Sequence, residues 1–258
     1  MKVWEVDVTM LSETCVAWKK KVPRRVLQQI AKQYNTTSCL TVSTSKVDIG
    51  GFLKPGGTGL ISMGNCNGLI LEKGVDKWNM GRWSYTLMGS PNITTTVLFV
   101  VGYRTGIQTG IPGEKTAWSQ QLTMLRKEGR TENPREAFLS DLAQWLRQYR
   151  TEGMEIFLSL DANEQWGENA EITKFANSFD LKNINQEFNL ASTHPNIANI
   201  QQSTTIDFCL CSLNILEHVQ YASSAPYELE TLGYHRGFIV DIDIARLLGK
   251  QDTDKELS

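Results

Sequence analysis

Residues 154–164 read MEIFLSLDANE, a nearly continuous apolar run that ends abruptly in polar residues. An apolar run of this length without alternation predicts a strand that is buried on both faces. Asp161 and Asn163 would then stand at the tip of that strand, although the same two residues also fit a simple turn that opens the next helix. A doubly buried strand needs a packed layer on each side, so this stretch indicates a layered α/β protein.

A helix is predicted directly before this strand, from Pro134 to about Tyr149. Asn133 is a suitable N-cap, Pro134 suits the first turn, and Glu136 can complete a capping box. The apolar stripe of this helix consists of Phe138, Leu142, Trp145, Leu146 and Tyr149. Two further helices are expected, over residues 23–34 and in the segment that ends at Met124.

Short β-branched or alternating segments predict the other strands. They comprise residues 3–10, 38–45, 60–63, 82–88, 94–103, 204–212 and 237–244. Strands joined partly by short turns and partly by helices favour a mixed α/β (α+β) sandwich over a parallel doubly wound sheet.

The composition favours one globular domain. The chain has 258 residues, of which 41% are hydrophobic and 21% charged, and no linker divides it, so we expect one domain over residues 1–249 and a polar, disordered tail over residues 250–258. The longest apolar stretch, residues 96–103, is far too short to span a membrane. The net charge of −2 excludes a generally basic nucleic-acid coat protein, but a phosphate-cleaving enzyme needs only local positive charge.

The five cysteines are odd in number and lack disulfide-framework spacing, which indicates free thiols and a reducing compartment. Because no signal peptide is recognisable, we expect an intracellular protein, nuclear or otherwise, that is not secreted. Cys209 and Cys211 alternate in an apolar run, so a buried pair is favoured over a zinc site.

Polar residues stand at the ends of several predicted strands. They are Glu13, Asp161, Asn163, Asp207 and His235. A two-sheet scaffold gathers a functional site from such strand ends along one rim. Each residue taken singly also fits a cap or turn.

Seven short motifs in order resemble the endonuclease/exonuclease/phosphatase superfamily, whose members include DNase I-like nucleases. They are Leu11-Ser12-Glu13-Thr14, Gly57-Thr58, Gly81-Arg82-Trp83, Tyr103-Arg104, LDANE at 160–164, IDF at 206–208 and HRG at 235–237. The resemblance covers residues 6–244, and the chain looks most like the endonuclease domains that accompany reverse transcriptases in retroelements. It implies a four-layer sandwich of two mixed, mainly antiparallel sheets flanked by helices.

The resemblance also implies a metal site. Glu13 matches the metal-binding glutamate of the family, a hard oxygen ligand for Mg²⁺ or Mn²⁺. Asp161 matches the aspartate that orients or deprotonates the attacking water. Asn163 matches the asparagine that binds the phosphate by a hydrogen bond.

Other motif residues match groups around the scissile phosphate. Tyr103 matches a catalytic tyrosine near the phosphate, and Arg104 is expected to add a charge-assisted contact to the phosphate. Asp207 and His235 match an Asp–His pair, in which the carboxylate orients the imidazole.

Two departures from the family pattern bear on activity. The first strand of the family, which carries an asparagine near the metal, has no counterpart here, so that strand is expected to be missing. Gly233-Tyr234-His235 stands where the family has Ser-Asp-His, and neutral Tyr234 cannot replace an acidic acceptor.

One basic cluster follows Glu13 in the sequence. It consists of Lys19, Lys20, Lys21, Arg24 and Arg25. The cluster suits contacts to a nucleic-acid backbone, and it equally suits a solvated start of a helix. The glycine-rich residues 56–59 fit a tight turn better than a phosphate cradle.

The resemblance implies a Mg²⁺-dependent phosphodiesterase, a DNA endonuclease of retroelement type attached to or encoded near a reverse transcriptase. Two alternatives stay open: a catalytically degenerate nucleic-acid-binding remnant, and a phosphomonoesterase of the same superfamily.

Overall fold

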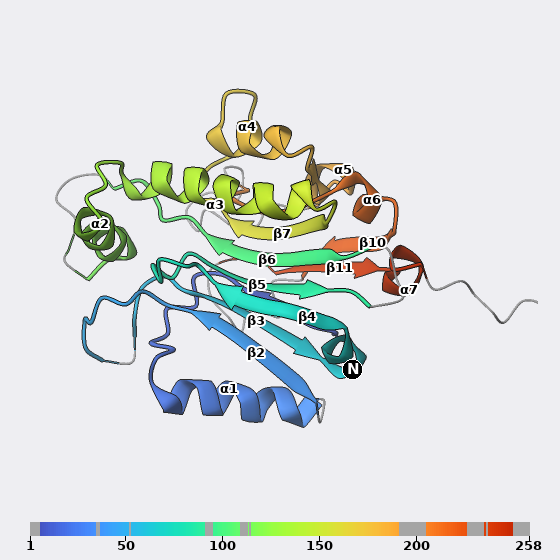
Figure 1. Ribbon diagram of the computed structural model, residues 1–258, viewed down its shortest axis with the longest axis horizontal. Coiled ribbons are helices and arrows are strands. Elements are labelled where there is room, and N and C mark those ends of the chain that lie inside the picture. The colour runs from blue at the N-terminus through green and yellow to red at the C-terminus, as the bar shows by residue number, and fades with distance from the viewer. Residues whose placement is uncertain are drawn as a thin grey trace, which may run out of the picture.

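The computed structural model describes residues 6–34, 37–51, 53–90, 95–108, 113, 115–190, 205–225, 235 and 237–249. Tyr234, Gly233 and the predicted tail lie outside these residues. A six-stranded sheet lies face to face with a layer made of two smaller sheets, and helices cover the outer sides (Figure 1).

The larger sheet has six strands in the order β4-β5-β6-β7-β9-β8. Their bounds are β4 Ile70–Val75, β5 Trp83–Met88, β6 Val97–Tyr103, β7 Glu155–Asp161, β8 Lys182–Asn183 and β9 Asp207–Cys211. The β6–β7 pair is parallel and the other pairs are antiparallel. Every residue of β6 is buried, as expected for a central strand covered on both faces.

Two smaller sheets cover one face of the large sheet. β1 Val8–Leu11, β3 Thr58–Met63 and β2 Ser38–Ser43 form an antiparallel sheet in the order β1-β3-β2, and β10 Val219–Ser224 pairs with β11 Phe238–Ile242. Side chains from both small sheets pack on the same apolar core as β6, β7 and β9.

Helices form the outer layers. Their bounds are α1 Lys21–Tyr34, α2 Ala117–Lys127, α3 Pro134–Thr151, α4 Glu171–Ser178, α5 Ile184–Glu187, α6 Leu213–Leu216 and α7 Ile244–Leu247, with one 3₁₀ turn at Gly64–Leu69. α1 covers the outer face of the three-stranded sheet, where Leu27 and Ala31 pack beside Ile61. α3 and α4 cover the opposite face of the six-stranded sheet. The predicted four-layer sandwich with mainly antiparallel sheets is confirmed.

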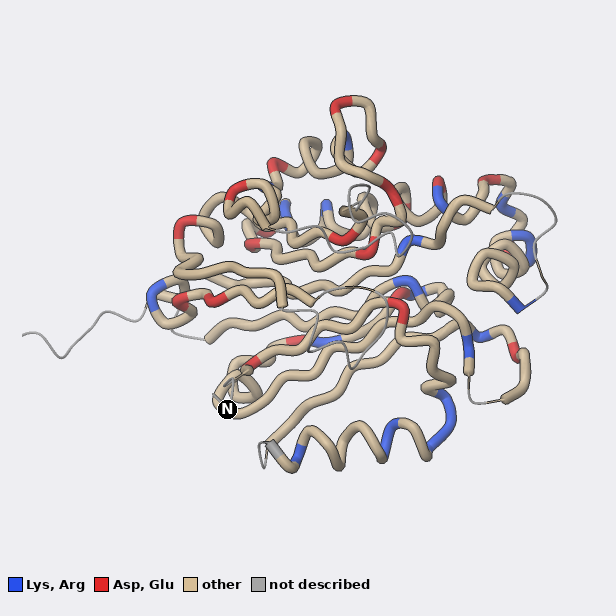
Figure 2. Tube along the Cα trace, turned by 180° about the vertical axis from the view of Figure 1, so that it is seen from behind, with Lys and Arg blue, Asp and Glu red and all other residues tan. Residues whose placement is uncertain are grey.

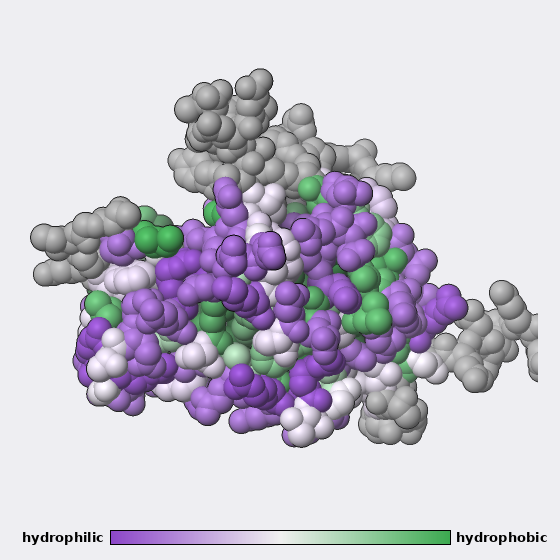
Figure 3. All heavy atoms as spheres, turned by 90° about the horizontal axis from the view of Figure 1, so that it is seen from above, coloured by the Kyte–Doolittle hydropathy of each residue, from purple (hydrophilic) through white to green (hydrophobic). Residues whose placement is uncertain are grey.

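The predicted features of α3 are confirmed as well. Asn133 Oδ1 accepts from the backbone N–H groups of Arg135 and Glu136, and the Glu136 carboxylate accepts from Asn133 N. The buried face of α3 includes Phe138, Leu142 and Leu146. Seen from above, the surface is mainly hydrophilic with small hydrophobic areas (Figure 3), as expected for helices that bury one face only.

The five cysteines are all free thiols. Cys209 and Cys211 are buried in the core between the sheets, so the expected buried pair is confirmed. Within the described residues, no helix combines the length and the apolar character needed to cross a membrane.

Candidate active site

Strand register brings three predicted site residues into one row. Tyr103 at the end of β6 pairs with Asp161 at the end of β7, and Asp161 pairs with Asp207 at the start of β9. Neighbouring strands lie roughly 4.8 Å apart, so three residues from distant parts of the sequence become neighbours at one edge of the large sheet.

Glu13 reaches this edge from the other sheet. It follows β1, and its carboxylate Oε1 accepts a hydrogen bond from Tyr103 Oη at 3.0 Å. The backbone of Glu13 has φ of 45° and that of Cys15 has φ of 52°. Non-glycine residues rarely adopt this left-handed region, and such strain often occurs at functional sites.

The turn at Gly56 and Gly57 holds the loop that carries Glu13. Thr14 N donates to Gly57 O at 3.1 Å, and Cys15 N donates to Gly56 O at 2.9 Å. Both glycines have positive φ, and a Cβ on Gly57 would lie 3.0 Å from Ser43 O. The expected tight turn is therefore present, and it supports the position of Glu13.

Asn163 binds the carboxylate of Asp161. Its backbone N–H and its side-chain amide both donate to Asp161 Oδ1, at 3.2 and 3.0 Å, and the same amide donates to Arg104 O at 2.9 Å. Asn163 also has a left-handed backbone, with φ of 47°. In this arrangement Asn163 orients Asp161, and the predicted phosphate contact requires the amide to exchange one of these partners for a phosphate oxygen.

Asp161 and Asn163 do not cap the next helix. The carboxylate of Glu164 accepts from the backbone N–H groups of Glu171 and Ile172 at the start of α4. The alternative reading of the strand end as a helix cap is thus wrong for Asp161 and Asn163.

The predicted pair of Asp207 and His235 is formed. His235 Nδ1 lies 2.7 Å from Asp207 Oδ2. This hydrogen bond with Asp207 raises the pKa of His235 from 6.5 to about 9, despite the opposing effect of burial. A protonated imidazole at neutral pH suits contact with an anion.

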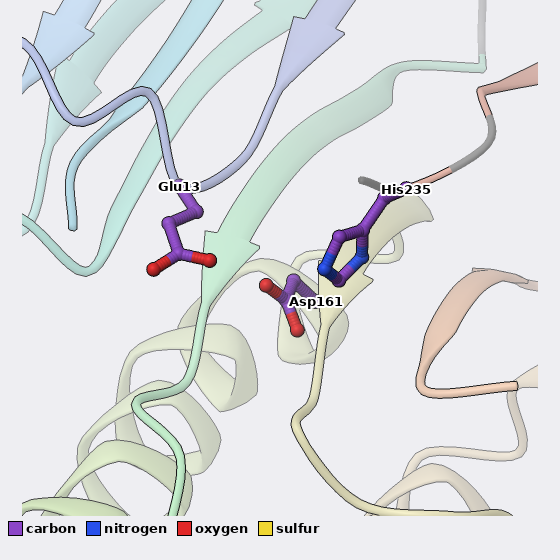
Figure 4. A group of neighbouring side chains, drawn as sticks. All are labelled: Glu13, Asp161 and His235. Atoms are coloured by element: carbon purple, nitrogen blue, oxygen red, sulfur yellow. The ribbon is translucent and has the colours of Figure 1, made fainter. Parts of the chain in front are cut away.

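Glu13, Asp161 and His235 converge on a common space (Figure 4). One potential ligand atom from each residue lies within 4.8 Å of the other two. Burial raises the pKa of Asp161 well above its usual value, and the negative charge of Asp207 adds to this rise. Excess negative charge among oxygen donors is the setting that a hard divalent cation would neutralise, so the carboxylates of Glu13 and Asp161 fit Mg²⁺ or Mn²⁺, with protonated His235 beside them.

Tyr103 stays a hydrogen-bond donor at this site. Burial of the phenol, followed by the nearby charges of Glu13 and Asp161, raises the pKa of Tyr103. The backbone N–H of Tyr103 donates to Arg82 O at 2.8 Å, and the buried guanidinium of Arg82 pairs with Asp76 and Asp141. This ion-pair network supports the end of β6.

The structure places the guanidinium of Arg104, the expected phosphate contact, inside the protein. Its guanidinium is fully buried, pairs with Glu164 at 2.7 Å and also contacts Glu171. Arg104 therefore supports the Asp161 loop in this arrangement. The phosphate contact stays a prediction, and it would require the side chain to leave these carboxylates.

The basic residues Lys19–Arg25 lie at the start of α1, where Lys19, Lys20, Lys21, Arg24 and Arg25 are exposed. Figure 2 shows basic residues gathered at this end of the helix. Lys19 Nζ donates to Lys46 O at 3.0 Å. A contact of this cluster with nucleic acid stays a prediction.

One supporting residue was missed by the sequence analysis. The buried amide of Asn185, on α5, donates to Asp207 O at 3.2 Å and accepts from Cys209 N at 2.9 Å. It continues the pairing of β9 beyond the two residues of β8 and so fixes the strand that carries Asp207. Nothing local distinguishes Asn185 from other polar residues of residues 182–189, because its partners lie more than 20 positions away.

No protein-family model and no curated protein matches this chain. Solved structures do match. The 3′ phosphatase NExo from Neisseria, bound to a product DNA hairpin, has a TM-score of 0.60 at 12% identity, over 92% of this chain and 89% of that chain.

Two other solved structures are similar. An endonuclease/exonuclease/phosphatase family protein from Leptotrichia buccalis C-1013-b has a TM-score of 0.54 at 14% identity, over 93% of this chain and 88% of that chain. The endonuclease domain of TRAS1, a telomere-specific non-LTR retrotransposon, has a TM-score of 0.53 at 12% identity, over 93% of this chain and 99% of that chain. At these identities the likeness shows the fold, which is the endonuclease/exonuclease/phosphatase fold that the motifs predicted.

Proposed function

We propose that this chain is a phosphodiesterase that depends on a divalent cation and cleaves nucleic acid. The observation that carries this proposal is the convergence of Glu13, Asp161 and His235 within 4.8 Å, at the strand ends where the motifs predicted a site. The likeness to nucleases and a DNA-bound phosphatase supports it, as far as a shared fold can.

Glu13 would hold the cation, with Asp161 close enough to share it. When bound, such a cation would polarise a phosphate oxygen and offset the charge that develops during attack by water. Tyr103 and Asn163 hold the two carboxylates in orientation through the hydrogen bonds described above.

Asp161 would accept the proton of the attacking water, the role that the motif match gives it. Its strand end stands between Tyr103 and Asp207 in the row. Protonated His235, held by Asp207, would face the phosphate and stabilise its negative charge. Neither step needs a covalent intermediate on the protein.

The finer proposal is a DNA endonuclease of retroelement type, encoded with or near a reverse transcriptase, that uses Mg²⁺ or Mn²⁺. The motifs predicted it, and the TRAS1 endonuclease domain has the same fold over 99% of its length. Nicked DNA in this setting would supply a 3′ end for a polymerase.

A substrate panel tests the proposal. Purified protein with Mg²⁺ or Mn²⁺ is given supercoiled plasmid, single-stranded RNA and an oligonucleotide with a 3′ phosphate. Nicking of the plasmid supports the endonuclease. Release of inorganic phosphate without chain cleavage would indicate a phosphomonoesterase, and DNA binding without any cleavage would indicate a degenerate binding module.

A further inference from the structure

The loop after β1 has a left-handed residue on each side of Thr14. Glu13 has φ of 45° and Cys15 has φ of 52°. The other described non-glycine residues with positive φ are Asn79, Asn163, Asp180 and Asn189. Asparagine and aspartate tolerate this region better than glutamate or cysteine do. Such a backbone persists only where surrounding contacts fix it, so the conformation of Glu13 depends on contacts made close to Thr14.

Backbone hydrogen bonds fix the path of this loop. Thr14 N and Cys15 N donate to the glycine turn as described above, and Lys54 N donates to Cys15 O at 2.8 Å. Any residue other than proline can donate such a bond from its backbone. These bonds would therefore form equally with another residue at position 14.

One hydrogen bond depends on the side chain of Thr14. Trp18 Nε1 donates to Thr14 Oγ1 at 2.8 Å, and Trp18 is only 4% exposed. A buried indole N–H is unfavourable without an acceptor. The bond thus ties the residue after Glu13 to a side chain that is fixed in the protein interior.

Gly57 leaves room for the Thr14 hydroxyl. A Cβ at position 57 would lie 3.0 Å from Thr14 Oγ1 and 3.9 Å from Trp18 Cδ1. Thr14 Oγ1 therefore lies close to both the indole and the glycine turn. Its position is fixed by contacts on two sides.

A displacement of Thr14 would reach the carboxylate of Glu13. The two residues are adjacent, and Glu13 is exposed. Its side chain is held by the loop backbone and by the hydrogen bond from Tyr103 Oη at 3.0 Å. Thr14 and Trp18 carry no carboxylate or imidazole, so they would act on the carboxylate site through Glu13.

We propose that Thr14 and Trp18 are positioning residues, which hold Glu13 in its left-handed conformation and so set the affinity of the carboxylate site for a divalent cation. The proposal rests on the proposed function for the cation. It gives neither residue a contact with the metal or with substrate. It assigns a role to Thr14 of the motif Leu11-Ser12-Glu13-Thr14, which the proposed chemistry leaves without one.

Binding of Mn²⁺ alone tests the proposal without any substrate. The dissociation constant is measured from the EPR signal of free Mn²⁺. Thr14→Val keeps the shape of the side chain and removes the acceptor, so it should raise the dissociation constant about tenfold. Thr14→Ser keeps the acceptor and should bind Mn²⁺ nearly as the wild type does. Equal dissociation constants for the wild type and Thr14→Val would overturn the proposal.

Ser212→Ala is the matched control. Ser212 Oγ is buried and accepts from Ile156 N at 2.8 Å, and Ile156 lies at the opposite end of β7 from Asp161. The variant removes the same kind of acceptor, so it should lower the midpoint of thermal unfolding in EDTA as Thr14→Val does. The Mn²⁺ dissociation constant should stay unchanged. An equal loss of Mn²⁺ affinity in Ser212→Ala and Thr14→Val would show a general effect of stability and overturn the proposal.

A double-variant cycle tests the part of Trp18. Trp18→Phe removes the donor and keeps an aromatic ring, so it should weaken Mn²⁺ binding. Adding Thr14→Val to Trp18→Phe should weaken binding no further, because both changes remove the same hydrogen bond. Effects that add would overturn the assignment of Trp18. If Trp18→Phe does not fold, hydrogen exchange of the Trp18 indole N–H decides: it should be faster in Thr14→Val than in Thr14→Ser, and equal rates would overturn the assignment.

The outcomes distinguish the positioning role from the proposed function. If the wild type binds Mn²⁺ and Thr14→Val binds it about tenfold more weakly, but no nucleic acid is cleaved, the proposed function fails and the positioning role stands. If nucleic acid is cleaved with Mn²⁺ and the wild type and Thr14→Val bind the ion equally, the positioning role fails and the proposed function stands. A wild type that binds no Mn²⁺ would overturn both.

Discussion

The phenol of Tyr103 donates a hydrogen bond to Glu13 Oε1 across 3.0 Å, between residues 90 positions apart. This contact joins the end of β6 in the large sheet to the loop after β1 in the small sheet. The carboxylate that is the best candidate for a metal ligand is therefore oriented by a residue from the opposite layer of the sandwich, and the packing of the two sheets sets the geometry of the site.

Tyr103→Phe should weaken metal activation. The ring and its packing are kept, but Glu13 loses the donor that orients it, and loss of such a supporting contact typically reduces metal affinity or activity about 10–100-fold. The concentration of Mg²⁺ that gives half-maximal nicking should rise accordingly.

Tyr85→Phe is the matched control, because Tyr85 Oη also donates to a glutamate, Glu72 Oε1 at 2.6 Å, away from the carboxylate site. It should leave the Mg²⁺ dependence unchanged. An equal change in both variants would show that loss of a tyrosine–glutamate hydrogen bond acts through general stability.

The pair of His235 and Asp207 should make stability depend on pH. The pKa of His235 is raised from 6.5 to about 9 in the folded protein, so the folded state binds the proton more tightly than the unfolded chain does. The resulting stabilisation is complete below pH 6.5 and is lost as the pH rises through about 9.

Urea unfolding in EDTA at a series of pH values measures this dependence. His235→Gln should abolish the decrease in unfolding free energy between neutral pH and pH of about 9, since the decrease depends on the proton of His235. His218→Gln, which changes a histidine bonded to Asn214 O, should retain it. If the decrease in unfolding free energy persists in His235→Gln, another titrating group causes it.

Arg104→Met tests the structural role of the buried Arg104 side chain. Removing the buried guanidinium takes the ionic partner from Glu164, whose carboxylate keeps its two backbone N–H donors. Loss of a hydrogen bond to a charged group typically costs about 1.5–3 kcal/mol of unfolding free energy. Urea denaturation should show this loss, whereas Arg147→Met, at an exposed position of α3, should change stability by less than about 0.5 kcal/mol. A stable Arg104→Met variant with weakened DNA binding would instead support the predicted contact between Arg104 and phosphate.

Local sequence patterns predicted the elements that have strong local signals. The apolar run of β7 and the capping box and apolar stripe of α3 depend on neighbours in the chain, and they were predicted nearly to their ends. β4 was missed because Glu72 and Lys73 interrupt an edge strand that is half exposed, and β8 was missed because two residues carry no periodicity.

For the site, the sequence predicted which side chains stand at strand ends, and the structure shows how register brings them together. The row of Tyr103, Asp161 and Asp207 follows from β6–β7 and β7–β9 pairing, which local patterns do not encode. The ion pairs of Arg104 were not predicted for the same reason, because its partner carboxylates lie 60 and 67 positions away.

The proposed cleavage requires a divalent cation acting between Glu13 and Asp161, and the rate of Mg²⁺-dependent plasmid nicking tests this most directly. Asp161→Asn, which keeps shape and removes charge, should lower the rate by at least about 100-fold. Asp180→Asn, at an exposed position after α4, should nick like the wild type. Equal nicking by wild type and Asp161→Asn, at the same metal and salt concentrations, would contradict the assignment of this site.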